Sequence, residues 1–453
     1  MKKINDSYTK AQSGNTPLIV SYFLSTLISS GCIALAGYLE IWILGTGQGA
    51  ADYLAAYAGV ATIQAWVTAV AYFIAMGTGC VVGEATKEEG IKKGCVGLTL
   101  GLLAGLGFVV ISLSLKPEWV TLLGAKESNV QDTFSGVKIM LLASPCLILS
   151  HIFGTFFRSM GKKVLSSVGL SLLGVAQIVS AIILSWSGVE KLDSVIWGIA
   201  IGETLSFFFF LTMWIIFLFI NKKCGLKGEK KNFERGKKFK NNMALFRNVI
   251  PGIIKSGLPS LARQGGISAG LWVTNLLAGK YSLEAQSVMT AANRFMTLPF
   301  GIIIAVCQAY QPIASRAEKA KEESEEEFIV ARRFGLWMIC IVLFGLFLAG
   351  KGILNMIPGQ FPGKDTLLVI IGSQTMVLPA VMYSQLIITQ FQVRKDWVAG
   401  TFLSVLRNAL VFIPVLWLMD YFMGIWGLFL GQSISDLLVL PISEKVFSKR
   451  VKS

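Results

Sequence analysis

Long blocks of apolar residues, separated by short polar segments, run along almost the whole chain. Residues 207–220, FFFFLTMWIIFLFI, form one such block, and it shows no alternation of apolar and polar positions. A helix needs about 20 apolar residues to cross the hydrocarbon of a bilayer. Only helices and closed barrels satisfy their backbone hydrogen bonds in lipid, and continuous blocks are typical of helices. The pattern therefore predicts an all-α membrane protein.

The blocks predict twelve transmembrane helices in two groups of six. We expect a first lobe at residues 1–220, a flexible basic linker on the cytoplasmic side at residues 221–250, and a second lobe at residues 251–453. The helices of the first lobe are expected at about Pro17–Gly45, Asp52–Gly83, Ile91–Leu115, Thr133–Phe157, Val164–Gly188 and Asp193–Ile220. Those of the second lobe are expected at about Pro251–Gly279, Glu284–Ser315, Ile329–Gly350, Asp365–Phe391, Trp397–Met419 and Gly424–Phe447.

The composition excludes a water-soluble protein and favours a gradient-driven transporter. Apolar residues make up 54% of the 453 positions, charged residues 15%, and the mean hydropathy is +0.64. The seven cysteines lack CxxC spacing, so we expect neither a metal site nor disulfides. The chain shows no nucleophile elbow, phosphate-binding loop or nucleotide domain. We therefore expect no enzyme activity and no cofactor, and ion gradients as the energy source.

The distribution of Lys and Arg predicts the topology. The polar N-terminus has no removable signal peptide by its pattern, and an even helix number places both termini on one side. If that side is the cytoplasm, about 31 of the 41 basic residues fall in inside loops or tails and about seven in outside loops. The other three are Arg263, Arg294 and Arg407, within helices. The net charge of +15 is therefore a topological signal and does not indicate nucleic acid.

The two halves contain an internal repeat. The fourth and tenth helices align at an offset of about 234 residues, and the sixth and twelfth at about 229. Because each half has an even helix number, the repeat is parallel and its axis lies along the membrane normal. This predicts two pseudo-symmetric bundles around a central cavity. The matched pairs are Pro145/Pro379, Ser150/Ser384, Phe157/Phe391, Trp197/Trp426, Gly198/Gly427, Gly202/Gly431 and Ser206/Ser435.

Two acidic residues in the first lobe are the candidates for ion coupling. Glu40 lies in the first helix and Glu203 in the sixth, at similar depth. A charge in the bilayer interior costs at least about 2.5 kcal/mol, so each needs a partner or a function. Two carboxylates close together in low dielectric favour the uptake of a proton or a Na⁺ ion. Pairing with a buried donor is the structural alternative.

Other charged residues within helices have different expected roles. Arg407 and Asp436 lie at matching depth in the last two helices, which favours a structural ion pair. Arg263 and Arg294 have no evident acid at matching depth in their own bundle, so they either face the cavity or bond backbone carbonyls. His151 is the single histidine, and it serves either as a proton relay or as an interhelical hydrogen-bonding group.

Several uncharged polar, aromatic and sulfur-containing side chains are candidates for lining the cavity. Amides suit interhelical bonds or polar lining, while aromatic rings and methionines suit flat organic cations. Each of them is also compatible with packing. Together with the charged residues above, the proposed lining is Gln64, Trp66, Tyr72, Met76, His151, Arg263, Asn275, Met289, Arg294 and Gln308.

Several stretches resemble the multidrug and toxic compound extrusion (MATE) family, particularly its members from Gram-positive bacteria. They are residues 256–320, which begin SGLPSLARQGGISAG, residues 406–438, which begin LRNALVFIPVLW, and FRSMGKK at residues 157–163. The resemblance spans nearly the whole chain. It implies two six-helix lobes in a V, in the cytoplasmic membrane of a bacterium. It also implies export of organic cations or other amphipathic compounds against H⁺ or Na⁺, by a monomer.

The resemblance also bears on individual positions. Family members commonly carry an acid in the first helix, where this chain has Glu40. Many have an Asn and then an Asp in the fifth helix, where this chain has Gln177 and Ala181, so the Asp is missing. A sixth-helix position that is often Thr is Glu203. The resemblance therefore implies coupling in the first lobe through Glu40, Gln177 and Glu203, with Na⁺ at Glu40 and Glu203 as one option.

Two other functions remain open from the sequence. A flippase of the same superfamily would move a lipid-linked oligosaccharide, and such proteins usually carry several cavity arginines; only three arginines lie within the predicted helices here. A multi-pass membrane enzyme or receptor would want a polar catalytic cluster or a large extramembrane domain, and no predicted outer loop is long enough. The expected partners are small substrates and membrane lipid.

Overall fold

The first half of the chain folds into six long helices and one short helical turn. The computed structural model describes residues 15–46, 49–225, 235–320, 325–356 and 363–451. The elements of this half are α2 (Asn15–Leu44), α3 (Ala50–Gly83), α4 (Lys87–Ser114), the 3₁₀ turn η2 (Pro117–Leu123), α5 (Val130–Ser159), α6 (Lys163–Trp186) and α7 (Lys191–Gly225). Each of the six predicted helices in this half corresponds to one observed helix.

The second half also follows the predicted order, but three of its helices are interrupted. Its elements are α8 (Arg235–Tyr281), α9 (Leu283–Phe295), α10 (Thr297–Ala320), α11 (Glu325–Met356), α12 (Lys364–Met376), α13 (Leu378–Val393), α14 (Trp397–Val405), the π-helical turn η3 (Leu406–Val411), α15 (Phe412–Met423) and α16 (Ile425–Val451). The predicted eighth helix is α9 with α10, the tenth is α12 with α13, and the eleventh runs from α14 through η3 to α15.

The repeated prolines act differently in the two halves. Pro145 lies inside α5, which continues without a break. Pro379 lies in the first turn of α13, directly after a break at Val377 where α12 and α13 meet at 48°. A proline removes one backbone hydrogen bond and clashes with the preceding turn, so the helix either continues through it or breaks beside it. The sequence repeat therefore predicts where a bend can occur and not its size.

The ends of the predicted linker are helical. Helix α7 continues to Gly225 and α8 begins at Arg235, so residues 221–225 and 235–250 belong to helices. The rest of the predicted linker, residues 226–234, lies outside the described residues.

The chain is a multi-pass membrane protein. Within the described residues, ten helices are long and apolar enough to cross a bilayer, and the bent pair α12–α13 raises this number to eleven. Helix α8 is not among them, because Lys255 and Arg263 and several glycines make its central segment polar. A polar spanning helix must face other helices or a cavity instead of lipid. Adding α8 gives the twelve spans that the sequence predicts.

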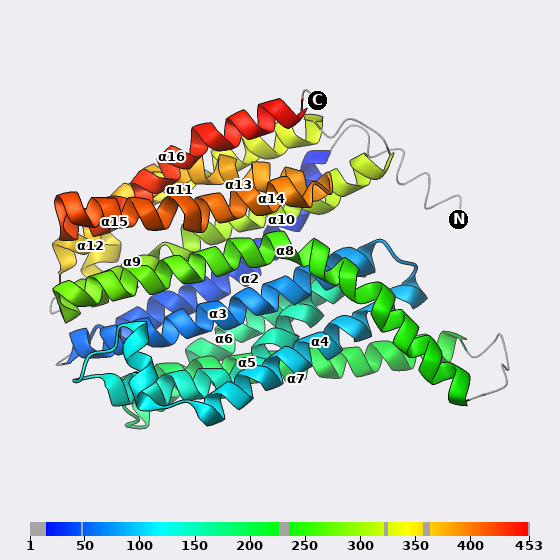
Figure 1. Ribbon diagram of the computed structural model, residues 1–453, viewed down its shortest axis with the longest axis horizontal. Helices are drawn as coiled ribbons and strands as arrows, with labels where there is room; N and C mark the ends of the chain where they lie inside the picture. Colours follow the sequence, from blue (N-terminus) through cyan, green and yellow to red (C-terminus); the bar gives the residue numbers. More distant parts are fainter. Residues whose placement is uncertain (1–14, 47–48, 226–234, 321–324, 357–362, 452–453) are drawn as a thin grey trace.

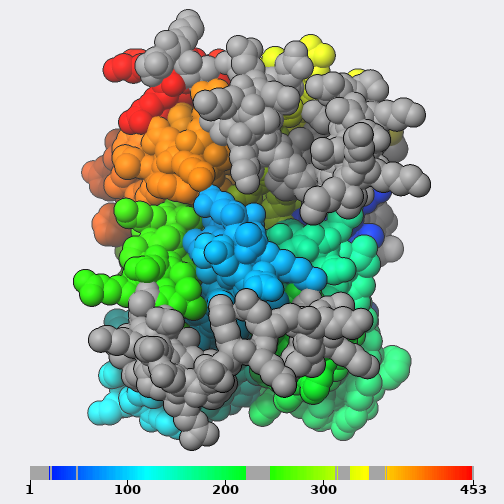
Figure 2. Space-filling model, turned by 90° about the vertical axis from the view of Figure 1, so that its right-hand side faces the viewer, coloured from blue at the N-terminus to red at the C-terminus, as the bar shows by residue number. Residues whose placement is uncertain are grey.

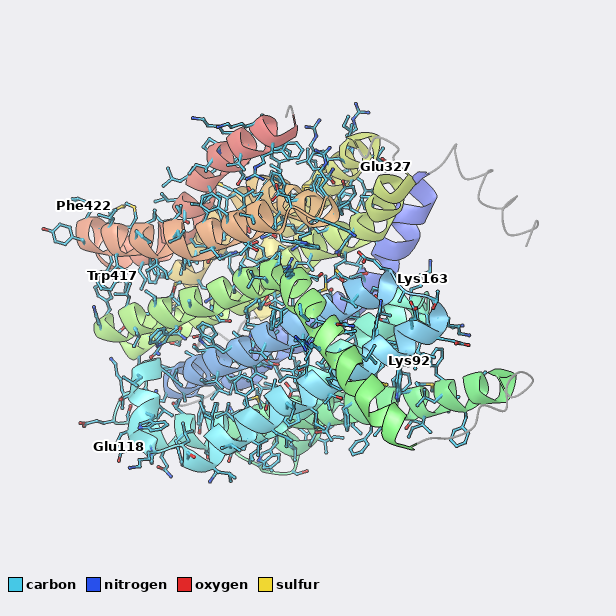
Figure 3. All side chains as sticks on the ribbon, turned by 45° about the vertical axis from the view of Figure 1, so that its right-hand side comes forward. Lys92, Glu118, Lys163, Glu327, Trp417 and Phe422 are labelled. Carbon is cyan, nitrogen blue, oxygen red and sulfur yellow. The ribbon has the colours of Figure 1, made fainter. Side chains whose placement is uncertain are left out.

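The helices form two bundles that lie side by side. In Figure 1, α3 to α7 occupy the lower half and α10 to α16 the upper half, while α2 runs from the upper half into the lower one. Helices α3 and α8 are adjacent where the bundles meet. Helix α2 begins and α16 ends at the same, right-hand end of the molecule. Figure 3 shows Lys92 and Lys163 toward this end, and Glu118, Trp417 and Phe422 at the other. This arrangement agrees with an even number of crossings; the compartment of the termini stays a prediction.

The two lobes touch at several points along α3. Near its C-terminal end, the Cβ of an alanine at Gly77 would lie 2.1 Å from the Ile253 carbonyl oxygen of α8, and one at Gly257 would lie 2.2 Å from the Phe73 oxygen. In the middle part of α3, Asn275 Nδ2 donates to Thr62 Oγ1 at 2.7 Å. The two backbones can approach so closely because both glycines lack a side chain. The predicted V-shaped opening stays a prediction.

An exposed ion pair also joins the lobes at the end shown in Figure 2. Lys395 Nζ lies 2.8 Å from Glu84 Oε1, and both side chains are 63% exposed. In Figure 2 the blue surface of the α3–α4 region lies at the centre, beside the green α8. An exposed pair stabilises by no more than about 1 kcal/mol. The pair therefore shows that the two lobes are close at this end, and it contributes little to the free energy of their association.

Large apolar side chains cover the outer surface of both bundles. This pattern is normal where lipid replaces water and would be unusual on a soluble monomer. Near the end opposite Lys92, aromatic residues project outward, among them Trp417 and Phe422 in Figure 3. Tryptophan and other aromatic rings at such a level are typical of the membrane interface. Examples of exposed apolar residues are Leu103, Ile183, Phe219, Trp337 and Val398.

Candidate functional site

Glu40 is buried in the first lobe and is held by three neighbours. Its carboxylate accepts hydrogen bonds from the Gln177 amide of α6 and the Tyr57 hydroxyl of α3. On the side of the second lobe, Arg294 Nη2 lies 3.4 Å from Glu40 Oε2. The Glu40 side chain is 3% exposed and that of Arg294 22%. A carboxylate can remain buried when it has such donors and an opposite charge.

Small residues in α6 and α7 bring Gln177 to Glu40. Gly174, one turn before Gln177, packs on the backbone of α2, where an added Cβ would lie 2.6 Å from the Cys32 carbonyl carbon. Gly198 and Gly202 of α7 pack on the Gln177 backbone, where an added Cβ would lie 3.0 Å from the Gln177 oxygen and 2.9 Å from its nitrogen. Because three helices approach at small residues, a side chain as short as Gln can span the remaining gap.

Arg294 connects the two lobes at this site. It lies in the last turn of α9, just before the break at Met296. Its Nη2 donates to the Tyr57 hydroxyl and, at 3.1 Å, to Gln64 Oε1, and its guanidinium lies 5.1 Å from the Tyr57 ring centroid. A guanidinium stacks well on an aromatic face while its fork bonds other groups. Arg294 therefore acts as the counter-ion of Glu40 from the opposite lobe.

Glu203 joins the same hydrogen-bonded chain through Gln64. It is 2% exposed, and its carboxyl group is hydrogen-bonded to the Gln64 side chain. Within the described part of the chain, no basic side chain lies within salt-bridge distance of Glu203. The two acids are thus connected through Gln64, Arg294 and Tyr57, without direct contact between their carboxylates in the structure.

A second polar group lies between the lobes, away from Glu40. The rings of His151 of α5 and Tyr72 of α3 have centroids 4.8 Å apart. Arg158, at the end of α5, donates from Nη1 to Gln308 Oε1 of α10 at 2.6 Å. Arg263 of α8 lies within electrostatic range of Tyr72, and so does Arg158.

The remaining predicted lining residues divide between packing and the lobe boundary. Met289 is buried in the largest apolar cluster, and the buried Asn275 bonds the Ala58 oxygen and Thr62. Trp66 touches α8 at Gly265. Met76 is half-buried on α3.

The structure places Arg407 and Asp436 in direct contact. Arg407 Nε donates to Asp436 Oδ1 at 2.8 Å, and both side chains are less than one-tenth exposed. Arg407 lies in η3, whose π-helical turn adds a residue to the helix and directs its side chain toward α16. A pair this closely satisfied agrees with the structural role that the sequence favours.

Sequence reasoning missed two residues of these sites, Tyr57 and Arg158. Tyr57 lies in the small-residue run LAAYAGV, where a tyrosine looks like packing. The sequence predicts that Arg158 lies in a cytoplasmic loop with Lys162 and Lys163. In the structure, α5 extends to Ser159, and the Arg158 side chain reaches Gln308 of the other lobe. The partner of Arg294 was also missed, because the search for an acid was confined to its own bundle.

The oxygen-rich surroundings of Glu40 suit a hard cation better than a transition metal. The described residues contain no group of three or more His, Cys, Asp or Glu side chains that could hold a metal ion. Carboxylate and hydroxyl oxygens come from Glu40 and Tyr57, and an amide oxygen comes from Gln64. Such oxygens are ligands for alkali and alkaline-earth ions. A Na⁺ site at Glu40 and Glu203 stays a prediction.

Known proteins with this architecture define the class. The fold is that of an inward-facing multidrug resistance MATE family transporter of the MOP superfamily, with a TM-score of 0.75 at 15% identity over 96% of this chain and 98% of that one. The VcmN MATE transporter of Vibrio cholerae gives 0.76 at 16% identity over 98% of each chain. An outward-facing MATE structure gives 0.73, so the matches favour neither state. The protein therefore has the MATE fold.

Sequence comparison identifies the family to which the chain is related. The family model described as lipid II flippase MurJ matches residues 90–452. The multidrug export protein MepA of Staphylococcus saprophyticus is 22% identical over 76% of this chain and 73% of its own, and that of Staphylococcus aureus N315 is also 22% identical over the same shares. The chain belongs to the MOP superfamily of transporters, in which the MurJ family and the MATE transporters both lie.

Proposed function

We propose that the protein is a secondary active exporter that moves organic cations or other amphipathic compounds out of the cell in exchange for H⁺ or Na⁺. The observation that carries this proposal is the environment of Glu40. Its buried carboxylate has two hydrogen-bond donors in its own lobe, and its opposite charge, the Arg294 guanidinium, belongs to the other lobe and can move away with it. Its relatives named as multidrug export proteins support the same substrate class.

The exchange follows from the position of Arg294. When the lobes are together at this level, the guanidinium neutralises Glu40. When they separate, Arg294 leaves with the second lobe, and Glu40 keeps only Tyr57 and Gln177 as partners. An uncompensated buried carboxylate is costly, so it takes a proton or Na⁺ from the open side. A cationic substrate reaching the same carboxylate displaces that ion, which couples the two movements.

Transport in proteoliposomes tests this mechanism. A fluorescent cation is loaded, and proton and sodium gradients are imposed separately. Glu40→Gln removes the exchangeable charge with little change of shape, so we expect coupled transport to be lost while the protein remains folded and inserted. Glu118→Gln is the matched control, because Glu118 is exposed at the far end of the molecule (Figure 3), and it is expected to transport normally.

A variant of the second acid, Glu203, tests whether the two acids form a coupling site or only a structural hydrogen-bonded network. Glu203→Gln is expected to lower the coupling without removing it, since its link to Glu40 runs through Gln64 and Arg294. If the double variant Glu40→Gln/Glu203→Gln transports the cation at the full rate, the assignment of these two acids as the ion-coupling site is wrong.

A flippase for lipid-linked oligosaccharides is the second candidate. The match to the MurJ lipid II flippase family over residues 90–452 favours it, and so does the presence of Arg158 in the space between the lobes as an additional arginine. A fluorescent lipid-linked oligosaccharide in the same proteoliposomes separates the two. Its gradient-dependent reorientation, with no transport of the fluorescent cation, would favour the flippase.

A further inference from the structure

The Arg294 side chain occupies the position beside Glu40 that a cationic ligand would take. Its Nη2 lies 3.4 Å from Glu40 Oε2, although Arg294 belongs to α9 of the second lobe and Glu40 to α2 of the first. The Arg294 stem runs past Gly37 of α2, where an added Cβ would lie 3.6 Å from Arg294 Cδ. The Tyr38 hydroxyl donates to the Phe295 oxygen at 2.7 Å and keeps α9 against α2. The guanidinium is therefore a cation that the protein itself supplies, attached to a helix.

Arg294 holds the Glu40 carboxylate loosely. The 3.4 Å between Nη2 and Oε2 is longer than the about 2.7–2.9 Å of an ordinary charge-assisted hydrogen bond. An ionised carboxylate offers about four acceptor positions, and the Tyr57 hydroxyl and the Gln177 amide use two of them. A guanidinium that is not attached to α9 can approach more closely and form two parallel hydrogen bonds. A free ligand with the same group therefore competes well against Arg294.

Arg294 keeps other partners after such a displacement. Its Nη2 also donates to Gln64 Oε1 at 3.1 Å, and its side chain is 22% exposed. It lies in the last turn of α9, where the negative end of the helix dipole stabilises a positive charge. Loss of the contact with Glu40 therefore does not leave an isolated buried charge. The guanidinium can leave the carboxylate and return to it, in competition with a ligand.

The surroundings of the guanidinium favour one kind of cation. The Tyr57 ring centroid lies 5.1 Å from the guanidinium carbon, and the Tyr57 hydroxyl and Gln64 Oε1 accept hydrogen bonds from Nη2. A planar cation with several N–H groups satisfies the ring and these acceptors together. A quaternary ammonium group has the same charge but no N–H group, so it leaves the acceptors unpaired. Guanidinium and amidinium groups therefore fit this position best.

We propose that Arg294 is a specificity-determining residue, a tethered competitor that holds the Glu40 site for the guanidinium or amidinium group of an amphipathic substrate. Arg294 occupies the site in the empty protein, and the substrate displaces it. A cation that forms too few contacts with Glu40, Tyr57 and Gln64 does not displace it and is not bound. The proposal rests on the proposed export function and names the organic cations that the site prefers.

Two ligands with the same charge and the same alkyl chain test the preference. Hexylguanidinium carries a fork of N–H groups, whereas hexyltrimethylammonium carries none. Their binding to the purified full-length protein is measured by calorimetry in a nonionic detergent, in an alkaline buffer free of sodium so that neither protons nor Na⁺ occupy Glu40. We expect hexylguanidinium to bind at least about tenfold more tightly, the effect of hydrogen bonds to a charged group. Equal affinity for the two ligands would overturn the preference, and this comparison needs no variant.

Variants of Arg294 test the competition. Arg294→Gln removes the tethered cation, so both ligands are expected to bind about tenfold more tightly, whereas loss of a purely structural residue would leave the affinity unchanged or lower it. Arg294→Lys keeps a positive charge without the planar fork, so we expect a smaller gain, and it takes the place of the Gln variant if that variant does not fold. Arg333→Gln, at an exposed arginine of α11, is the matched control and is expected to bind as the unmodified protein does. Unchanged or weaker binding by the folded Arg294 variants would overturn the proposal.

The binding and transport measurements fail independently. If the fluorescent cation is transported against a gradient but the two hexyl ligands bind equally, the export function stands and the preference is overturned. If hexylguanidinium binds as expected but no gradient drives the movement of any cation, the preference stands and the export function is wrong. Glu40→Gln is expected to weaken the binding of both ligands at least about tenfold. Unchanged binding by this variant would show that the ligands bind elsewhere, which overturns the proposal.

Discussion

At the scale of single residues, Glu40 is an acid within an apolar helix, where a charge is costly unless it has partners. Its carboxylate accepts hydrogen bonds from Gln177 and Tyr57, and Arg294 lies beside it as the opposite charge. Tyr57 could not be predicted, since a tyrosine among small apolar residues looks the same whether it packs or donates. The partner of Arg294 could not be predicted either, because the sequence does not say which helices of opposite lobes are adjacent.

The Tyr57 hydroxyl provides a test of the Glu40 site. Tyr57→Phe removes the group that donates to Glu40 and accepts from Arg294 but keeps the ring beneath the guanidinium. We expect folding to be retained at a cost of about 1 kcal/mol and coupled transport to slow without being lost. Thermal stability of the purified protein and transport in proteoliposomes check both. A Tyr57→Phe protein that transports at the normal rate would show that the hydroxyl only packs.

At the scale of helices, periodicity and length predicted nearly all elements, and interruptions were the main differences. The breaks at Met296 and Val377 and the π-helical turn η3 all fall in the second half. The sequence signals a proline near the break at Val377, but the same signal at Pro145 leaves α5 continuous. Whether a proline bends a helix depends on the neighbours that satisfy the freed carbonyl, and those come from tertiary contacts.

Helix packing beside Pro145 can be tested with two glycines of α4. A Cβ at Gly105 would lie 2.7 Å from the Pro145 Cα, whereas a Cβ at Gly107 would have nothing within 4 Å. Gly105→Val should therefore force α4 from α5 and reduce the yield of folded, monodisperse protein. Gly107→Val is the control on the same helix and should express normally. Equal yields from the two variants would contradict the close α4–α5 contact.

At the scale of the whole molecule, the sequence predicted two bundles but not how they meet. The internal repeat and the even number of helices in each half predicted two parallel halves, and the fold is that of MATE transporters. The contact of α3 with α8 along its length, and the pairing of Glu40 with Arg294, depend on the relative position of the lobes. A transporter changes that position during its cycle, so one sequence must be compatible with several such arrangements.

The closed arrangement at one end depends on Gly77. Gly77→Ala would place a methyl group against the Ile253 backbone, which cannot yield as a flexible side chain can. We expect the lobes to separate at this end and the population of the open state to rise. The distance between spin labels on the two lobes checks this. Gly83→Ala, with nothing within 4 Å of the new Cβ, should leave the distance unchanged.

The crossing of Gly77 and Gly257 has a consequence for the energy supply of the cell. Where two main chains meet with no side chains between them, there is no room for a file of water molecules at that crossing. Protons hop along files of water, so we expect this contact to help keep the membrane potential from being dissipated through the protein. We therefore expect a bulkier residue at either glycine to cause a passive leak of protons across the membrane before it reduces the amount of folded protein.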